Sequence, residues 1–175
     1  SSIFIKPDGS IKMYHKVHLV PFAEYIPLSD KYPLLKKLNF GQGNFTSGKE
    51  YTVFELDSVK FSNIICYESS MPSLVRSFVK NGAQFITIQA NDGWLGNSAG
   101  PYQHFELARL RAVENRVPIV RCANTGISGV INPAGIVQNK IHLDKKSIII
   151  ADILPTQNLT FYTRYGEVFA ILCII

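Results

Sequence analysis

Short apolar runs alternate with two longer amphipathic stretches along this chain. The short runs have the length of strands rather than helices, and turn-forming residues bound them. They predict strands over residues 52–56, 59–66, 85–89, 118–123, 129–132 and 147–153. The two longer stretches predict helices over residues 72–80 and 101–115. This order predicts a layered domain of the α/β or α+β class, and we expect α+β, with helices packed against a sheet.

Local signals mark the ends of the two helices. Pro72 suits a first helical turn because its missing N–H is not needed there, and Asn81-Gly82 ends that helix. On the second helix, four residues recur at helical spacing and are expected to form the buried face. They are Tyr102, Phe105, Ala108 and Ala112.

Turn-forming residues predict two hairpins and two loops. Pro7-Asp8-Gly9 and Pro133-Ala-Gly135 each separate two apolar runs, as tight hairpin turns do. Residues 16–33 contain three of the nine prolines of the chain and predict an extended loop that ends at Pro33. Residues 41–48 predict a second loop.

The sequence closes on eight consecutive apolar residues, Val168-Phe-Ala-Ile-Leu-Cys-Ile-Ile175. A membrane span needs about 20 such residues. The run is therefore either a terminal core strand or the first turns of a truncated transmembrane helix, and we expect the helix. Tyr162, Arg164 and Tyr165 precede it and would suit an interface anchor. Both ends of the sequence are expected to be cut.

Composition and charge narrow the function classes. Of the 175 residues, 46% are hydrophobic and 18% are charged, which indicates a folded domain with a sizeable core. The net charge of +5 comes from scattered basic residues, so nucleic acid is not an expected partner. The three cysteines lack metal-ligand spacing and do not form a disulfide pattern, and Cys122 is expected to pack in the core. No metal site is expected.

Cys66 stands where a thiol can be presented for chemistry. It follows an apolar run and precedes the helix predicted at Pro72, a position near the positive end of a helix that favours thiolate, the nucleophilic form. Taken alone, such a cysteine is more often a small buried hydrophobe. Lys16, Glu24 and Glu68, taken alone, are typical surface residues.

Four segments together resemble the nitrilase, or carbon–nitrogen hydrolase, superfamily. They are Lys16-Val-His-Leu-Val-Pro-Phe-Ala-Glu-Tyr-Ile-Pro27, Ile65-Cys-Tyr-Glu68, Asn91-Asp-Gly-Trp94 and Arg121-Cys-Ala-Asn-Thr-Gly-Ile-Ser128. The first segment is most similar to the apolipoprotein N-acyltransferase branch, whose members are bacterial membrane enzymes. The resemblance implies a four-layer α-β-β-α sandwich, with residues 1–167 forming the C-terminal part of a catalytic domain and residues 168–175 starting a membrane helix. It places that domain at the bacterial inner membrane, facing the periplasm.

The resemblance also implies an active site. The family uses a Glu-Lys-Cys triad, in which Cys66 matches the nucleophile and Lys16 the lysine. Glu24 matches a supporting glutamate, Tyr67 and Glu68 match the two residues after the nucleophile, and Trp94 matches a loop residue bordering the substrate. No acidic residue precedes Lys16 except Asp8, in a predicted turn, so the triad glutamate is expected in a segment that this chain lacks. The 175 residues alone are therefore expected to be inactive.

The implied reaction uses no dissociable cofactor. A phospholipid donates an acyl chain to the cysteine as a thioester, and the α-amino group of a lipoprotein's diacylglyceryl-cysteine accepts it. The ammonium of Lys16 and the backbone N–H of Tyr67 would stabilise the oxyanion. Two other interpretations remain open: a soluble amidase or nitrilase acting on a small amide or nitrile, and a non-catalytic fragment that binds lipid or partners.

Overall fold

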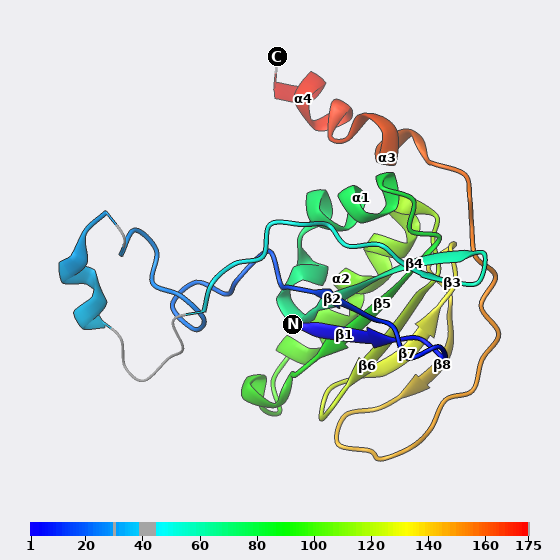
Figure 1. Ribbon diagram of the computed structural model, residues 1–175, viewed down its shortest axis with the longest axis horizontal. Helices are drawn as coiled ribbons and strands as arrows, with labels where there is room; N and C mark the ends of the chain where they lie inside the picture. The colour runs from blue at the N-terminus through cyan, green and yellow to red at the C-terminus, as the bar shows by residue number, and fades with distance from the viewer. Residues whose placement is uncertain (30, 39–44, 175) are drawn as a thin grey trace.

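The computed structural model describes residues 1–29, 31–38 and 45–174 (Figure 1). Its strands are β1 (Ser2–Ile5), β2 (Ile11–Tyr14), β3 (Phe54–Leu56), β4 (Val59–Ile65), β5 (Phe85–Ala90), β6 (Ile119–Ala123), β7 (Ser128–Ile131) and β8 (Val137–Ile141). Its α-helices are α1 (Pro72–Lys80), α2 (Gly100–Asn115), α3 (Phe161–Tyr165) and α4 (Val168–Ile174). Three short 3-10 helices are η1 (Pro33–Leu38), η2 (Cys66–Ser70) and η3 (Gly93–Leu95).

Six of the described strands form one sheet in the order β3-β4-β5-β6-β7-β8. The pairs β4–β5 and β5–β6 are parallel, and the other pairs are antiparallel. Parallel neighbours need a crossover, and α1 and α2 supply the two crossovers. The carboxyl ends of β4 and β5 therefore lie at the same edge of the sheet, where Cys66 and Asn91 follow them.

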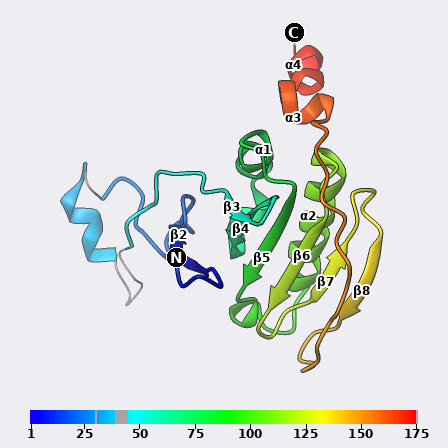
Figure 2. The same cartoon turned by 45° about the vertical axis from the view of Figure 1, so that its right-hand side comes forward.

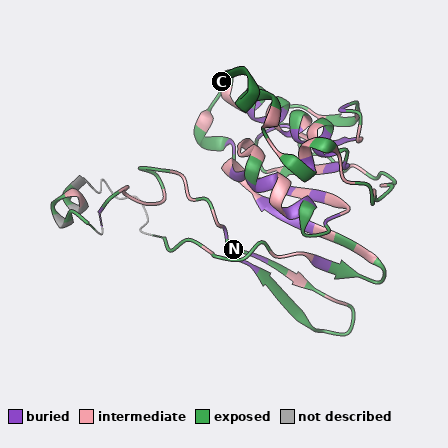
Figure 3. Cartoon of the chain, turned by 90° about the horizontal axis from the view of Figure 1, so that it is seen from above, coloured by how far each residue is buried: buried purple, intermediate pink, exposed green. Residues whose placement is uncertain are grey.

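One face of the sheet packs against α1 and α2. Alternate strand residues point to this face and are almost completely buried, because successive side chains of a strand leave on opposite sides. The buried core there comprises Ile64, Ile86, Ile88, Ile119 and Ile131 from the strands and Leu74, Val75, Phe78, Phe105, Ala108 and Ala112 from the helices. Figure 3 shows this buried interior in purple against the exposed surface in green.

The opposite face of the sheet is less covered. Phe61 and Phe85 stack on it with ring centroids 5.0 Å apart, and Phe4 of the β1–β2 hairpin packs edge-on against Phe61. The chain after β8 passes over the same face, in front of the sheet in Figure 2. Of the predicted four-layer sandwich, the described residues thus contain one helix layer and the six-stranded sheet, and β1 and β2 form a separate two-stranded sheet.

The strand predicted over residues 147–153 is wrong. This segment has no strand pairing, and Ile148 and Ile150 are exposed, whereas Ile149 and Ile153 face the sheet. An apolar run shows that a segment can be covered, but it does not show that the segment pairs as a strand; this one crosses the face of the sheet and does not add to its edge. The edge strand β8 pairs with β7 alone among the described strands.

The buried face of α2 also differs from the prediction. Tyr102 is 48% exposed, whereas Phe105, Ala108 and Ala112 are buried as expected. His104, Arg111 and Asn115 complete the buried face. Polar residues occupy positions that the hydrophobic pattern cannot identify as buried.

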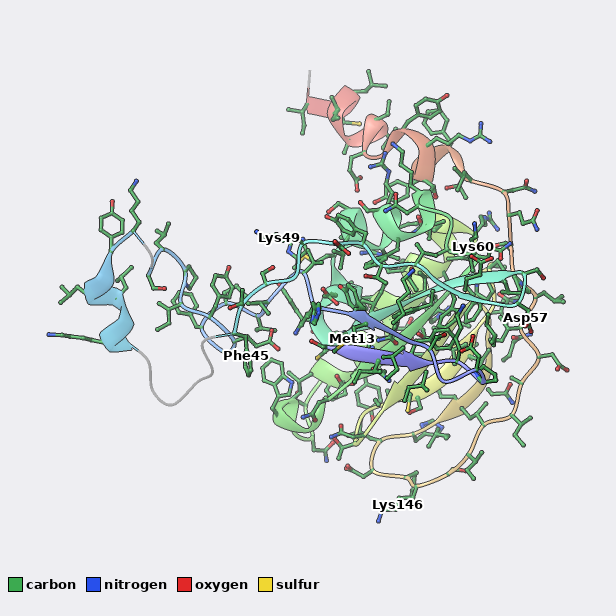
Figure 4. All side chains as sticks on the ribbon, in the orientation of Figure 1. Met13, Phe45, Lys49, Asp57, Lys60 and Lys146 are labelled. Atoms are coloured by element: carbon green, nitrogen blue, oxygen red, sulfur yellow. The ribbon has the colours of Figure 1, made fainter. Side chains whose placement is uncertain are left out.

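The remaining predicted elements are observed with small shifts in their ends. The hairpins around Pro7-Asp8-Gly9 and Pro133-Ala-Gly135 form, and the first predicted helix matches α1 at both ends. Residues 16–29 and 31–38 form turns and η1 in an arm that leaves the sheet, and Phe45 lies where the arm returns (Figure 4). Of the loop predicted over residues 41–48, residues 41–44 lie outside the described residues.

The C-terminal run is helical. Helix α3 docks on α1, because Arg76 donates hydrogen bonds to the carbonyls of Tyr162, Thr163 and Arg164. Helix α4 follows with Phe169, Leu172 and Ile174 exposed, and Ile175 lies outside the described residues. Within the described ranges, no helix has the length and apolar character that a membrane crossing needs. A membrane role for this run stays a prediction.

Candidate active site

Cys66 is the first residue of η2, at the sharp turn that directly follows β4. Its φ of 53° lies in the left-handed region, which is uncommon for a residue with a side chain and is found at functional turns. The thiol Sγ lies 3.9 Å from the carbonyl oxygen of Asn91, at the end of the neighbouring strand β5. The predicted position of Cys66 at a strand-to-helix turn is therefore observed.

Lys16 and Glu24 form a close ion pair beside this turn. The Lys16 Nζ lies 2.7 Å from both Oε1 and Oε2 of Glu24. Lys16 is only 8% exposed, and the N–H of Val20 donates to Glu24 Oε2 at 2.8 Å. Because the lysine head group is held by one carboxylate, it has a fixed position rather than a solvated one.

The returning arm presses against the backbone beside Lys16. The N–H of Gly48 donates to the carbonyl of Lys16 at 2.7 Å. A Cβ at position 48 would collide with the carbonyl oxygen of His15, so only glycine permits this approach. The two ends of the arm thus meet at the lysine.

Glu68 joins the lysine loop to the cysteine turn. Its Oε1 accepts hydrogen bonds from the Tyr14 hydroxyl at 2.6 Å and from the N–H groups of Val17 and His18 at 2.7 and 3.0 Å. Its Oε2 accepts from the N–H of Ile65 at 2.9 Å. Glu68 has no exposed surface, so it contacts both loops from inside the protein.

A cavity of about 520 Å³ brings the predicted residues together. Lys16, Glu24, Cys66 and Trp94 line it, with Ile65, Gln89 and Asn91 from the sheet edge and Val20, Ala23 and Ala90 around them. Trp94, on η3, is 63% exposed at its rim. Tyr67 follows the cysteine in η2 and is half-buried. A thiol, an ammonium and a carboxylate thus line one open cavity, an arrangement that suits acyl transfer.

A buried polar cluster that the hydrophobic pattern did not reveal lies beneath the cysteine turn. It consists of Ser69, Asp92, His104 and Arg121, each at most 8% exposed. Burial raises the pKa of Asp92, but the hydrogen bond from His104 and the charge of Arg121 outweigh burial and lower it below the usual value. The sequence carries one signal for the burial of His104: it lies four residues before Ala108, on the buried face of α2.

Cys122 was expected in the core, and that prediction is wrong. Cys122 is exposed. It pairs in register with Gln89 and points to the less covered face of the sheet, whereas its neighbour Arg121 points to the helices. Among the described residues, no group of three or more His, Cys, Asp or Glu side chains is arranged to hold a metal ion.

The chain matches known proteins in sequence and in fold. The family model for carbon–nitrogen hydrolase matches residues 1–157. The apolipoprotein N-acyltransferase of Geobacter metallireducens is 36% identical over 99% of this chain and 34% of its own length. The Rickettsia bellii protein of that name is 41% identical over 97% of this chain and 34% of its own length. This chain therefore spans about a third of the length of these relatives.

Solved structures show the same fold at lower identity. Nit3 of Saccharomyces cerevisiae, a nitrilase-superfamily member, gives a TM-score of 0.60 at 22% identity, over 82% of this chain and 49% of that one. The amidase of Nesterenkonia sp. AN1 in complex with butyramide gives 0.61 at 18% identity, over 99% of this chain and 60% of that one. The predicted nitrilase-like α+β fold is confirmed, and the chain belongs to the carbon–nitrogen hydrolase family.

Proposed function

We propose that this chain carries the nucleophile and the lysine of an apolipoprotein N-acyltransferase. The observation that carries the proposal is the convergence of Cys66 and the Lys16–Glu24 pair on one cavity at the edge of the sheet. Relatives of that name, at 36% and 41% identity over nearly the whole chain, support an acyltransferase over a soluble amidase. The amidases resemble the chain at identities that bear on the fold alone.

The proposed reaction has two steps at Cys66. The thiolate attacks the ester carbonyl of a phospholipid, and the tetrahedral oxyanion collapses to a thioester while the lysophospholipid leaves with a proton. The α-amino group of a diacylglyceryl-cysteine then attacks the thioester. An amide forms, the amine loses a proton, and the thiol is regenerated.

Lys16 would stabilise the oxyanion, assisted by the backbone N–H of Tyr67. Glu24 accepts from the ammonium with both oxygens and so holds it in the cavity. Trp94 lies on the open rim, where an apolar ring suits an acyl chain or a lipid glycerol group. Glu68 is buried and saturated with donors, so we assign it the joining of the two loops rather than contact with substrate.

The general base is proposed to come from outside these 175 residues. Asp8, the one carboxylate before Lys16, is fully exposed in the β1–β2 turn, where its hydrogen bonds with Ser10 lower its pKa. It lies at the end of β2 remote from Lys16, so it does not reach the thiol. The relatives are about three times the length of this chain, which leaves room for the missing carboxylate.

Phospholipid donor and lipoprotein acceptor both require a membrane surface. We propose that residues 1–167 belong to a catalytic domain at the periplasmic face of a bacterial inner membrane. Helix α4 would begin a membrane helix, since Phe169, Ile171 and Leu172 are exposed on it. The names of the relatives support this location indirectly, through the lipoprotein substrate that those names state.

The test is acyl transfer by the whole protein in membranes, from labelled phospholipid to a diacylglyceryl-cysteine peptide. We expect transfer by the wild type and by Cys122→Ala, and none by Cys66→Ala. Hydrolysis of small amides without acyl transfer would contradict the proposal and favour an amidase. The absence of both acyl transfer and amide hydrolysis would favour a non-catalytic protein.

A further inference from the structure

The buried cluster beneath the cysteine turn has no part in the two chemical steps. Ser69, Asp92, His104 and Arg121 come from η2, the loop after β5, α2 and β6, and each is more than nine-tenths buried. Burying so many polar groups is costly unless each has a partner. We therefore ask which neighbouring part of the protein these four side chains hold in place.

Asp92 and Arg121 fix the ring of His104 from one side. His104 Nδ1 lies 2.8 Å from Asp92 Oδ1, and Arg121 donates to Asp92 Oδ2 at 2.7 Å. Arg121 is itself anchored, because its Nε donates to the carbonyl of Ile127 at 3.1 Å. Arg121 Nη2 also lies 3.0 Å from Nδ1, so the carboxylate and the guanidinium together set the orientation of the ring.

The other ring nitrogen faces the backbone of the nucleophile. His104 Nε2 lies 3.1 Å from the carbonyl oxygen of Cys66 and 2.9 Å from Ser69 Oγ. The Ser69 hydroxyl also lies 2.9 Å from that carbonyl. The carbonyl belongs to the residue with a φ of 53°, a conformation that persists only where its surroundings hold it.

We propose that His104 is a positioning residue for the nucleophile. Oriented by Asp92 and Arg121, its Nε2 side, together with Ser69, holds the Cys66 carbonyl and so keeps the left-handed turn that presents the thiol to Lys16. This inference rests on the proposed function, because it takes Cys66 as the nucleophile. His104 acts through the backbone and does not touch substrate.

Two substitutions of His104 test the contacts of its two ring nitrogens separately. His104→Gln places an amide N–H near the position of Nε2 and keeps a donor for the Cys66 carbonyl. His104→Asn places its amide near Nδ1, so it keeps the contact with Asp92 and loses the donor to Cys66. Both replace an aromatic ring by a smaller amide, so a purely structural role of His104 would make them similar.

The experiment measures alkylation of Cys66 by iodoacetamide in the whole protein, with every other cysteine, Cys122 and Cys173 included, replaced by serine. We expect His104→Gln to react within about threefold of the parent rate and His104→Asn to react about 10- to 100-fold more slowly, the cost of an unmade buried hydrogen bond. The acyl-transfer kcat should follow the same order, with the KM for phospholipid unchanged. Equal rates in the two variants, or a faster His104→Asn, would overturn the proposal.

A second variant covers the case in which His104→Asn does not fold. Ser69→Ala keeps the imidazole but removes the hydroxyl that contacts both the Cys66 carbonyl and His104 Nε2, and we expect alkylation up to about tenfold slower. An unchanged rate would overturn the proposal. Alkylation in the expected order by an enzyme that forms no acyl-Cys66 would contradict the proposed function while supporting the role of His104.

Discussion

The hydroxyl of Tyr14 donates a hydrogen bond of 2.6 Å to Glu68 Oε1, and both side chains are completely buried. Tyr14 is the last residue of β2, two positions before Lys16, and Glu68 lies two positions after Cys66. This contact therefore ties together the two segments that supply the ammonium and the thiol. Its loss should affect both stability and catalysis.

Tyr14→Phe should destabilise the protein by about 1–3 kcal/mol, because the buried Glu68 loses a donor. Burial, with the charge and hydrogen bond of Glu68, also raises the pKa of Tyr14 above its ordinary value of 10.0. Above that value the folded state retains a proton that the unfolded state loses, so the free energy of unfolding falls as the pH rises. Denaturant unfolding should show that the free energy of unfolding falls less between about pH 9 and pH 11 in Tyr14→Phe than in the wild type. The control is Tyr102→Phe. If the free energy of unfolding falls between the two pH values as much in Tyr14→Phe as in the wild type, the raised pKa of Tyr14 does not cause the fall.

Lys16→Met should lower the acyl-transfer rate by about 100- to 1,000-fold, the usual effect of removing an oxyanion donor. Lys16→Arg should not restore the rate. A guanidinium can pair with both Glu24 oxygens, but it is larger and planar and does not place its charge where the compact ammonium lies. Lys146→Met is the matched control, since Lys146 lies in the exposed loop after β8 (Figure 4). Near-normal turnover in Lys16→Met would exclude this role.

Asp92→Asn should cost about 3–5 kcal/mol of stability near neutral pH, because it leaves Arg121 buried without its charge partner. The pKa of Asp92 is lowered, so its stabilisation is present above the ordinary value of 3.8 and is lost as the pH falls below it. Acid unfolding should therefore be less steep in Asp92→Asn than in the wild type. The control is Asp152→Asn, at an exposed position, and identical acid profiles for wild type and Asp92→Asn would contradict the account.

The sequence allowed the fold and the cavity residues to be predicted better than the polar support beneath them. Pro72 and Asn81-Gly82 specify the ends of α1 locally, so that helix is observed as predicted. Residues 147–153 are as apolar as a strand, but they cross the face of the sheet and do not pair at its edge, a difference that a local pattern does not report. The sequence pattern did not predict a role for His104, because that role depends on contacts with Asp92 and Cys66, which are 12 and 38 residues away in sequence.

Cys173 offers a test of the membrane role of α4. In intact membranes, a membrane-impermeant maleimide should leave Cys173 unlabelled, because apolar residues surround it in a helix expected to enter lipid. Solubilisation in detergent and denaturant should expose it. A cysteine placed by Lys146→Cys in a protein lacking the native cysteines is the control and should react throughout. Rapid labelling of Cys173 in intact membranes would show that α4 remains in water.

The most direct test of the central claim is the mass of the whole protein after incubation with a phospholipid of defined acyl chains and no acceptor. We predict an adduct of one acyl chain on Cys66, released by hydroxylamine as a thioester should be, and present in Cys122→Ala. Cys66→Ala should carry no adduct, and addition of a diacylglyceryl-cysteine peptide should discharge the wild-type adduct. A hydroxylamine-sensitive acyl adduct that persists in Cys66→Ala would contradict the assignment of Cys66 as the nucleophile.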